Sequence, residues 1–259
     1  MNVLLTNDDG IDGEGLIVMK RFLEQAGHSV YVVAPDGNRS GVSMAISLFD
    51  EHTIVKHGTN MWSYSGTPAD CVITALTSEL IPVRIDAVVS GINAGANIGT
   101  DVIYSGTCGA ARQAVLYGYP GIALSLEKEP LSDWDYFNFE PLASFAASNL
   151  EEICRAASLE NPRGFVNINA CNIKEFKSVV VCDSLSVRNY NDRKLVEETE
   201  DVTPDGKPVF RVRFRDSDIQ TSAACKSDYH AVSNGCIALS LVQAEPGAMK
   251  VEKDMNFAL

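Results

Sequence analysis

The stretch Val3-Leu4-Leu5-Thr6-Asn7-Asp8-Asp9-Gly10 stands at the start of the chain and decides its fold class. Its first half is a short apolar run without polar alternation, which is typical of a strand buried on both faces. A helical pattern of apolar residues follows from about Glu14 until Gly27 ends it. Ser29–Ala34 is then a second β-branched run, closed by Pro35. The order strand, helix, strand predicts a unit with two parallel strands.

The same alternation continues through the first two thirds of the chain. Thr67 is a candidate N-cap with Pro68 in the first helical position and Asp70 in the third, so a helix is expected to begin there. The later segments are a buried strand over Asp86–Ser90, a glycine-rich stretch over 91–109, a helix over 110–117, and apolar runs at Ile122–Leu126 and Phe165–Ile168. This pattern predicts an α/β fold with a mostly parallel sheet flanked by helices on both faces.

The character of the sequence changes from about Ser186. Residues 188–218 are rich in charge and contain the turn signal Thr203-Pro204-Asp205-Gly206-Lys207. Beyond that turn, Phe210, Val212 and Phe214 alternate with Arg211 and Arg213, which predicts a projecting β-hairpin. We therefore expect a core over 1–187, a hairpin over 188–218, and a segment over 219–259 that returns to the core.

The apolar side of the predicted hairpin needs a covering partner. An isolated two-stranded ribbon is marginal in water, and an apolar stripe on a projecting arm is an unusual surface. A second copy of the chain, bound about a two-fold axis, is the partner that we expect. The alternative is that the stripe folds back onto its own core.

Composition excludes several classes of protein. The 259 residues carry a formal net charge of −13, which argues against binding along a nucleic-acid polymer, because phosphate contacts need a surplus of Lys and Arg. A small phosphorylated substrate is compatible with that charge if a metal ion and backbone N–H groups supply local positive potential. The seven cysteines form no CxxC pair, and no segment resembles a signal peptide or a transmembrane helix. We expect a cytoplasmic protein without membrane contacts.

Polar groups follow each of the first three long strands. Asp8 and Asp9 come after the first, Asn38-Arg39-Ser40-Gly41 after the second, and Asn93 after the third. Ligands bind beyond the carboxyl ends of parallel strands, and carboxylates with neutral oxygens suit Mg²⁺, Mn²⁺ or Ca²⁺. Arg39 can also grip a phosphate or carboxylate. Each loop alone is explained as well by a solvated turn or a helix cap, but three in succession favour a site.

A fourth segment, Tyr104-Ser105-Gly106-Thr107, leads directly into a helix. Hydroxyls and free N–H groups at a helix N-terminus form an anion site, although an N-cap without a ligand fits the same residues. The preceding glycine-rich segment Ser90–Gly99 does not match the dinucleotide fingerprint and has no Walker lysine. The four segments together offer carboxylates, neutral oxygens and phosphate donors.

These residues resemble the SurE 5′(3′)-nucleotidases. The similarity is strong over roughly residues 1–126 and thins to Asp228 and Asn234-Gly235 beyond that. Its motifs stand in the family's order: Leu4–Ile11, Val33-Ala34-Pro35 with Asn38–Gly41, Gly66–Cys71, Ser90–Asn93 with Gly95 and Asn97, and Asp101–Thr107. The chain departs from the family at Gly13-Glu14-Gly15, Met44 and Gln113-Ala114, where Ala-Pro-Gly, His and Glu-Gly are frequent. These departures bear on substrate preference and rate.

The resemblance implies a site and an assembly. It implies one divalent metal ion per subunit (Mg²⁺, Mn²⁺ or Ca²⁺) held by Asp8, Asp9, Ser40 and Asn93, with Asp8 and Asp9 catalytic. It places the substrate phosphate near Asn97, Ser105, Gly106 and Thr107. It further implies a Rossmann-like core, with the hairpin and the C-terminal tail of 219–259 used in a homodimer or homotetramer.

The expected activity is metal-assisted hydrolysis of nucleoside 5′-monophosphates to nucleoside and phosphate. Whether 3′-monophosphates and short polyphosphate are also cleaved stays open, as does the role of Asp8 as base, nucleophile or ligand alone. One rival is an aspartyl-phosphate phosphatase, whose two aspartates are usually separated by one residue, whereas Asp8 and Asp9 are adjacent. The other is a nucleotide- or metal-binding regulatory protein without turnover.

Overall fold

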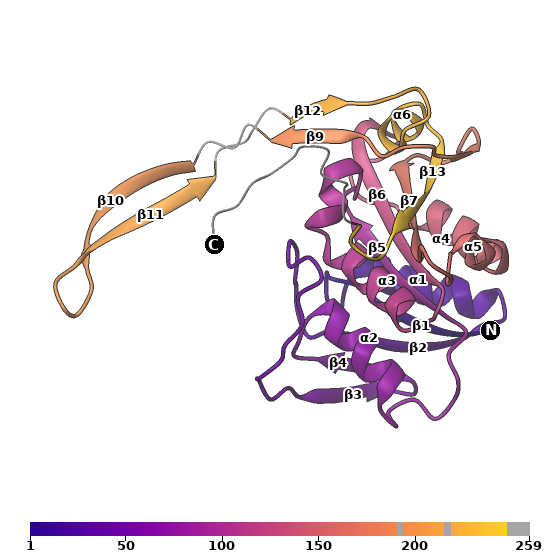
Figure 1. The fold of residues 1–259 in the computed structure, drawn as a ribbon, viewed down its shortest axis with the longest axis horizontal. Helices are drawn as coiled ribbons and strands as arrows, with labels where there is room; N and C mark the ends of the chain where they lie inside the picture. The colour runs from indigo at the N-terminus through magenta and orange to yellow at the C-terminus, as the bar shows by residue number, and fades with distance from the viewer. Residues whose placement is uncertain (191–193, 215–218, 248–259) are drawn as a thin grey trace, which may run out of the picture.

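A nine-stranded sheet forms the centre of the molecule (Figure 1). The structure, a computed structural model, describes residues 1–190, 194–214 and 219–247. The strands in order across the sheet are β3 (Ile54–Gly58), β4 (Met61–Tyr64), β2 (Ser29–Pro35), β1 (Asn2–Thr6), β5 (Ala87–Ala94), β6 (Gly121–Ser132), β7 (Gly164–Asn172), β13 (Ile237–Gln243) and β8 (Val179–Val181).

The strand β1 lies inside this sheet and pairs in parallel with both β2 and β5. Val3 and Leu5 belong to the apolar core on one face of the sheet, and Leu4 belongs to the core on the other face. Two-sided burial is the reason that the run lacks polar alternation. The pairs β2–β4, β5–β6 and β6–β7 are also parallel, while β3–β4 and β7–β13 are antiparallel. The predicted fold class is confirmed.

Helices cover both faces of the sheet, as Figure 1 shows. On one face pack α1 (Glu14–Gln25), α4 (Glu140–Ser148) and α5 (Leu150–Ala156), and on the other α2 (Pro68–Thr77) and α3 (Gly106–Leu116). The start of α2 is the predicted one. The Thr67 hydroxyl accepts from the Asp70 backbone N–H at 3.2 Å, and the Asp70 carboxylate accepts from the Thr67 N–H at 3.0 Å. This reciprocal cap fixes the helix start.

Several predicted elements differ in extent from the observed ones, among them the apolar runs at 122–126 and 165–168, which belong to the longer strands β6 and β7. The strand β5 does not end at Ser90 but runs to Ala94, because its pairing with β6 shifts register between Ser90 and Asn93 and then resumes. The helix α3 begins at Gly106 rather than Ala110, since Ser105 caps it. The strands β3 and β4 and the helices α4 and α5 were not predicted.

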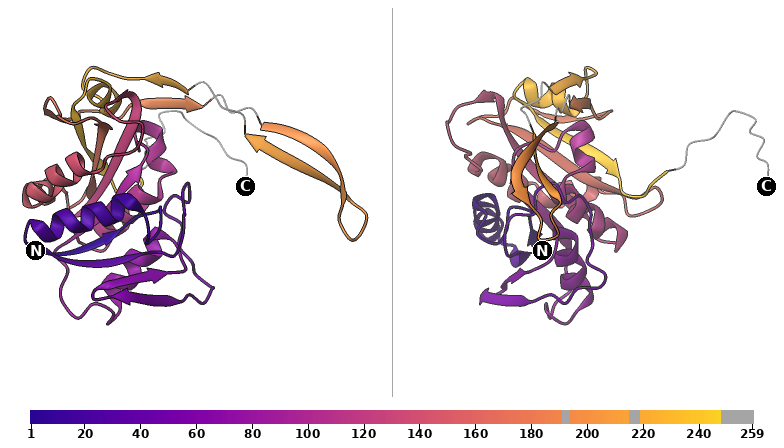
Figure 2. Two further views of the ribbon diagram at one scale, coloured as in Figure 1. Left: turned by 180° about the vertical axis from the view of Figure 1, so that it is seen from behind. Right: turned by 90° about the vertical axis from the view of Figure 1, so that its left-hand side faces the viewer.

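The last third of the chain forms antiparallel ribbons beyond the sheet. Here β9 (Val187–Tyr190) pairs with β12 (Ile219–Ser222), and β10 (Lys194–Val202) pairs with β11 (Pro208–Phe214). The short helix α6 (Asp228–Ser233) precedes β13. In Figure 1 and in the left view of Figure 2 the ribbon of β10 and β11 extends away from the core, so the predicted projecting hairpin is confirmed.

The predicted apolar stripe lies on this hairpin and is exposed. Phe210 and Val212 are 52% and 55% exposed, and Val196, which faces Val212 across the ribbon, is 60% exposed. The side chain of Phe214 and the predicted tail over 248–259 lie outside the described residues. Within the described part, the stripe does not fold back onto the core. None of the helices in that part has the length and apolar character needed to cross a membrane.

The position of α1 against the sheet depends on Gly15. A Cβ atom at Gly15 would lie 1.9 Å from the carbonyl oxygen of Ile92 in β5, far inside van der Waals contact. The helix therefore touches the strand backbone directly, immediately before Asn93. Any side chain at Gly15 must push α1 and β5 apart.

We expect Gly15→Ala to lower the free energy of unfolding by about 1–3 kcal/mol, the usual effect of overpacking a close contact. Denaturant unfolding measures this change. Gly58→Ala is the matched control, because nothing lies within 4 Å of the added methyl group, and its effect should stay within about 0.5 kcal/mol. Equal stability of Gly15→Ala and the wild type would show that the backbone contact does not hold α1 in place.

Candidate active site

The carboxyl ends of β1, β2 and β5 meet at one edge of the sheet, because the three strands are parallel neighbours. The chain leaves β1 toward β2 and later returns to β5 on the opposite side of β1, so β1 stands at a topological switch point, where α/β sheets bind ligands. A cleft of about 360 Å³ opens there. Its lining includes the predicted residues Asp8, Ser40, Asn93, Asn97 and Ser105, together with Asp101, Tyr104 and Tyr190.

Asp8 is held in place by hydrogen bonds from the N-terminus of α3. Its carboxylate accepts from the Thr107 hydroxyl at 2.5 Å and from the Thr107 backbone N–H at 3.2 Å. The helix can come this close only because residue 106 is glycine: a Cβ atom at Gly106 would lie 2.9 Å from the Asp8 Cβ. Burial raises the pKa of Asp8, whereas the bonds from Thr107 act in the opposite direction. The side chain is 3% exposed.

Asp9 adds a second carboxylate to the same edge. Burial raises its pKa, the negative charge of Asp8 raises it further, and a bond from the backbone N–H of Ala94 opposes the shift. Among the ion pairs of residues 1–190, 194–214 and 219–247, none involves Asp8 or Asp9. Two neighbouring acids, Asp8 buried and Asp9 half-buried, thus stand without an ion pair in the described part of the chain, which is the electrostatic setting of a cation site.

Neutral oxygens complete the set of donors. The amide nitrogen of Asn93 donates to the carbonyl oxygen of Gly95 at 2.7 Å, which leaves its amide oxygen as the ligand group. The loop that carries Ser40 is shaped by Asn38, whose side chain accepts from the Ser40 N–H at 2.8 Å. No cluster of three His, Cys, Asp or Glu side chains with metal-binding geometry occurs in the described part of the chain. Two carboxylates with hydroxyl and amide oxygens match Mg²⁺, Mn²⁺ or Ca²⁺ rather than zinc.

Arg39 does not serve the cleft. Its guanidinium donates to the Asp36 carboxylate at 2.7 Å and to the carbonyl oxygen of Ser65 at 3.3 Å, and it is absent from the lining. The sequence allows Arg39 either a phosphate or a carboxylate, and in this structure the group that it binds is a carboxylate. Asp36, which follows β2, accepts from one amino group of the guanidinium. Arg39 contributes to the site through its backbone N–H, which donates to the carbonyl oxygen of Asp8 at 2.6 Å.

The N-terminus of α3 contributes to the cleft through Ser105. Its hydroxyl accepts from the Cys108 N–H at 3.0 Å and caps the helix, and its side chain borders the cleft. The hydroxyl of Thr107 is already bonded to Asp8. In this structure Thr107 therefore positions a carboxylate, and its predicted contact with the phosphate stays a prediction.

Asn97 is fixed by a buried polar network that the sequence did not suggest. Its backbone N–H donates to the Asn169 side chain at 2.8 Å, and its amide nitrogen donates to the Ser125 hydroxyl at 2.8 Å. Its carbonyl oxygen accepts from Asn167 at 2.9 Å and from Asn169 at 3.1 Å. Two asparagines at alternate positions of the buried strand β7 were the available signal, because buried amides persist only where they are bonded.

Asp101 and Asp228 link the cleft to the far end of the molecule. Arg188 of β9 donates to Asp101 at 2.5 Å, and Tyr190 of the same strand bonds the other carboxylate oxygen. Asp228, which is fully buried, accepts from the N–H groups of Gly99 and Ser186 at 2.7 and 2.8 Å. The bonds made by Asp101 and Asp228 thus hold the 3₁₀ turn η1 (Gly99–Ile103) in place, and this turn precedes Ser105.

The fold and the cleft define an α/β protein with an acidic, cation-attracting site at the switch point of its sheet. Comparison with known proteins agrees with this class. The sequence profile of the family described as "Survival protein SurE" matches residues 3–192. The chain belongs to the SurE family, and the resemblance drawn from the motifs is confirmed.

Individual relatives show the extent of the similarity. A "5′-nucleotidase SurE" of Treponema pallidum (strain Nichols) is 45% identical over 173 residues, which are 66% of this chain and 90% of that protein. A "5′-nucleotidase SurE" of Acinetobacter baumannii (strain AYE) is 31% identical over 265 residues and covers the whole of both chains. The crystal structure of the SurE protein from Aquifex aeolicus has a TM-score of 0.75 and 28% identity, over 95% of this chain and 94% of that one.

The raised pKa of Asp9 gives a prediction for stability. A carboxyl whose pKa is higher in the folded than in the unfolded state stabilises the fold at low pH, and that contribution is lost as pH rises from 3.8 through the raised pKa. Asparagine does not ionise but keeps the acceptor for the Ala94 N–H. In chelator at pH 7, Asp9→Asn should therefore melt at a higher temperature than the wild type, by about 2–4 °C for each kcal/mol recovered, and the difference should shrink toward zero as the pH falls to about 4.

Asp12→Asn makes the same charge change at an exposed position of the same loop, and its melting temperature should stay close to that of the wild type at every pH. Differential scanning calorimetry from pH 4 to 8 measures all three proteins. A wild type that melts above Asp9→Asn in chelator at pH 7 would contradict the view that the two carboxylates destabilise the metal-free fold.

Proposed function

We propose that this chain hydrolyses nucleoside 5′-monophosphates to nucleoside and phosphate, with a divalent cation bound at the cleft. One observation carries the proposal: a buried and a half-buried carboxylate, neither in an ion pair within the described residues, share an edge of the sheet with neutral oxygens and with the N-terminus of α3. The names of the curated relatives support the substrate class.

The residues divide the work by their positions. Asp8, Asp9, Ser40 and Asn93 would hold the cation, which supplies Lewis-acid polarisation of a phosphoryl oxygen. Both oxygens of Asp8 accept hydrogen bonds from Thr107. This fixed carboxylate is better suited to bind a cation than to attack as a nucleophile. Ser105 and Asn97 face the same cleft and are suited to bind and orient the phosphate. The N-terminal end of α3 adds a favourable potential for an anion.

A second function fits the same residues. A regulatory protein could bind a nucleotide and a metal here without turnover. Measured binding does not distinguish such a protein from an enzyme, whereas measured turnover does. An aspartyl-phosphate mechanism is less suited to this cleft, because the carboxylate oxygens of Asp8 are engaged by α3 and Asp9 does not belong to the cleft lining. Nucleoside 3′-monophosphates and short polyphosphate belong in the same assay as candidate further substrates.

The test is phosphate release from a nucleoside 5′-monophosphate by the purified full-length chain. We expect turnover with Mn²⁺ or Mg²⁺, its loss in excess chelator, and its return when the cation is restored. Asp9→Asn should lower kcat/KM by about 100-fold or more, since it removes an anionic ligand from a hard-cation site, whereas Asp12→Asn should keep activity within about twofold. Full turnover in excess chelator would disprove the metal requirement. Binding of nucleotide and Mn²⁺ without turnover would favour the regulatory function.

The projecting hairpin supports a proposal about assembly. We propose that the chain forms a homodimer or homotetramer in which the stripe of Val196, Phe210 and Val212 is covered by another subunit, and that residues 188–218 and 219–259 serve as arm and returning segment of a core over 1–187. The three side chains are each more than half exposed on one ribbon, and an exposed apolar stripe of this kind is typical of an interface.

Replacing residues 194–214 by a short Gly/Ser linker should lower the molecular mass measured by size-exclusion chromatography with light scattering. The core elements and the cleft loops before residue 108 do not depend on the hairpin and should keep their circular dichroism and Mn²⁺ binding. A milder double variant, Phe210→Ser with Val212→Ser, should weaken assembly in a concentration-dependent way. An unchanged mass for both variants would mean that assembly uses another surface.

A further inference from the structure

Two aromatic residues, Tyr104 and Tyr190, border the cleft at the carboxyl ends of β1 and β5. Tyr190 is engaged within the protein, because its hydroxyl bonds Asp101 and the guanidinium of Arg188 lies 6.0 Å from its ring centre. Tyr104 is 61% exposed. Among the described residues, its ring contacts no other aromatic ring and no cation, and its hydroxyl makes no hydrogen bond. Tyr104 is therefore the aromatic residue of the cleft that is available to a ligand.

The backbone of Tyr104 is fixed beside the proposed phosphate site. Its N–H donates to the carbonyl oxygen of Asp101 at 3.0 Å, and its carbonyl oxygen accepts from the Ser43 N–H at 2.9 Å. Tyr104 directly precedes Ser105, whose side chain borders the cleft and caps α3. Since consecutive Cα atoms are about 3.8 Å apart, the part of a ligand next to a phosphate at Ser105 comes within reach of the tyrosine ring.

Most of the polar side chains that border the cleft already have a task. Ser40 and Ser105 belong to the proposed cation and phosphate sites. The others form hydrogen bonds within the protein: Asp8 with Thr107, Asn93 with Gly95, Asn97 with Ser125, and Asp101 with Arg188. A ligand group beyond the phosphate therefore meets an aromatic face rather than a set of side chains that read hydrogen-bonding edges.

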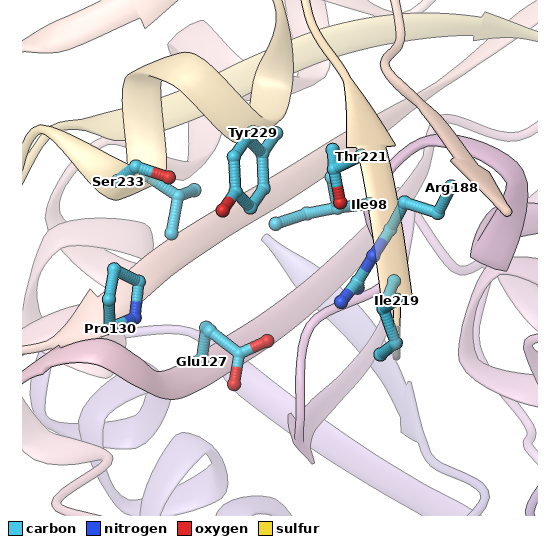
Figure 3. A pocket seen from close by; sticks show the side chains of 9 residues that line it. Ile98, Glu127, Pro130, Arg188, Ile219, Thr221, Tyr229 and Ser233 are labelled. Carbon is cyan, nitrogen blue, oxygen red and sulfur yellow. The ribbon is translucent and has the colours of Figure 1, made fainter. Parts of the chain in front are cut away.

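A second hollow, of about 210 Å³, lies between α6, β6 and the ribbon of β9 and β12 (Figure 3). The ring of Tyr229 projects into it from α6. None of the residues that line this hollow also lines the cleft. The surface that contacts the rest of a ligand bound by its phosphate is therefore expected in the cleft itself, and Tyr229 offers a comparison for Tyr104.

We propose that Tyr104 binds the base of the nucleotide by stacking, and that this contact makes the chain prefer nucleotides to phosphate esters without a base. The inference rests on the proposed function and adds a residue that determines specificity to it.

Stacking has two consequences for the kinetics. Every base has a π-face, so a stacking contact accepts purines and pyrimidines alike. The base is remote from the phosphoryl group, and its contact is the same in the bound substrate and in the transition state. Loss of such a contact raises KM and leaves kcat largely unchanged.

The test compares kcat and KM of the full-length, Mn²⁺-loaded chain for adenosine 5′-monophosphate, uridine 5′-monophosphate and ribose 5-phosphate, which has no base. In the wild type, kcat/KM for each nucleotide should exceed that for ribose 5-phosphate by about tenfold or more. Tyr104→Ala should lower both ratios about tenfold through a higher KM for the nucleotides, the effect of losing one stacking contact. Tyr104→Phe keeps the ring and should keep both ratios.

Two control variants should leave both ratios unchanged. Ile103→Ala alters the adjacent side chain, which is 59% exposed but does not border the cleft, and Tyr229→Ala removes the tyrosine of the other hollow. Ratios measured on one protein cancel differences in folded fraction. Equal kcat/KM of the wild type for all three substrates, or ratios of Tyr104→Ala within twofold of the wild type, would overturn the inference and leave the proposed function standing. No hydrolysis of either nucleotide would overturn both.

Discussion

Two carboxylates, Asp8 and Asp9, follow directly after the strand β1, and neither forms an ion pair with any of the residues that the structure describes. The rest of the site is arranged around this constraint. The helix α3 comes within contact of Asp8 because Gly106 has no side chain, and Thr107 bonds both oxygens of that carboxylate. The loops after β2 and β5 bring neutral oxygens rather than further charge. This arrangement favours the binding of a cation from solution.

This need has an energetic side. Burying an unpaired carboxylate opposes folding, and a second one beside it adds repulsion. The burial of Val3, Leu4 and Leu5 on the two faces of the sheet offsets this unfavourable free energy at β1. Binding of a cation to the folded chain alone then adds stability by mass action. Under the proposed function, stability and activity are therefore coupled at the same two residues.

The sequence predicted the central strands and most of the cleft lining, because these follow from local rules. Apolar runs without alternation identify two-sided strands, Thr67 and Asp70 identify a capped helix, and polar residues after parallel strands must converge. The parts that it missed depend on long-range contacts. Whether Arg39 binds a phosphate or a carboxylate stayed open in the sequence, because only the structure shows Asp36 and Ser65 around it. Asn167 and Asn169 looked like ordinary strand residues until their bonds to Asn97 were seen. The contacts of Asp101 with Arg188 and of Asp228 with Gly99 join segments far apart in the chain, which no local pattern encodes.

These long-range contacts give the far end of the molecule a part in the site. The turn η1 is bonded on one side to β9 and on the other to Asp228 at the start of α6, and it leads directly into Ser105. The strand β9, which leads toward the hairpin, and the start of α6 thus hold the segment that enters α3 beside the cleft.

The central claim is that Asp8 and Asp9 hold a cation together with Ser40 and Asn93, and an anomalous difference map from crystals grown with Mn²⁺ tests it most directly. The account predicts one peak per chain at the carboxyl end of β1, with oxygens of these four side chains within about 2.6 Å. A map with no peak at that place, or with Mn²⁺ bound only by other residues, would contradict it.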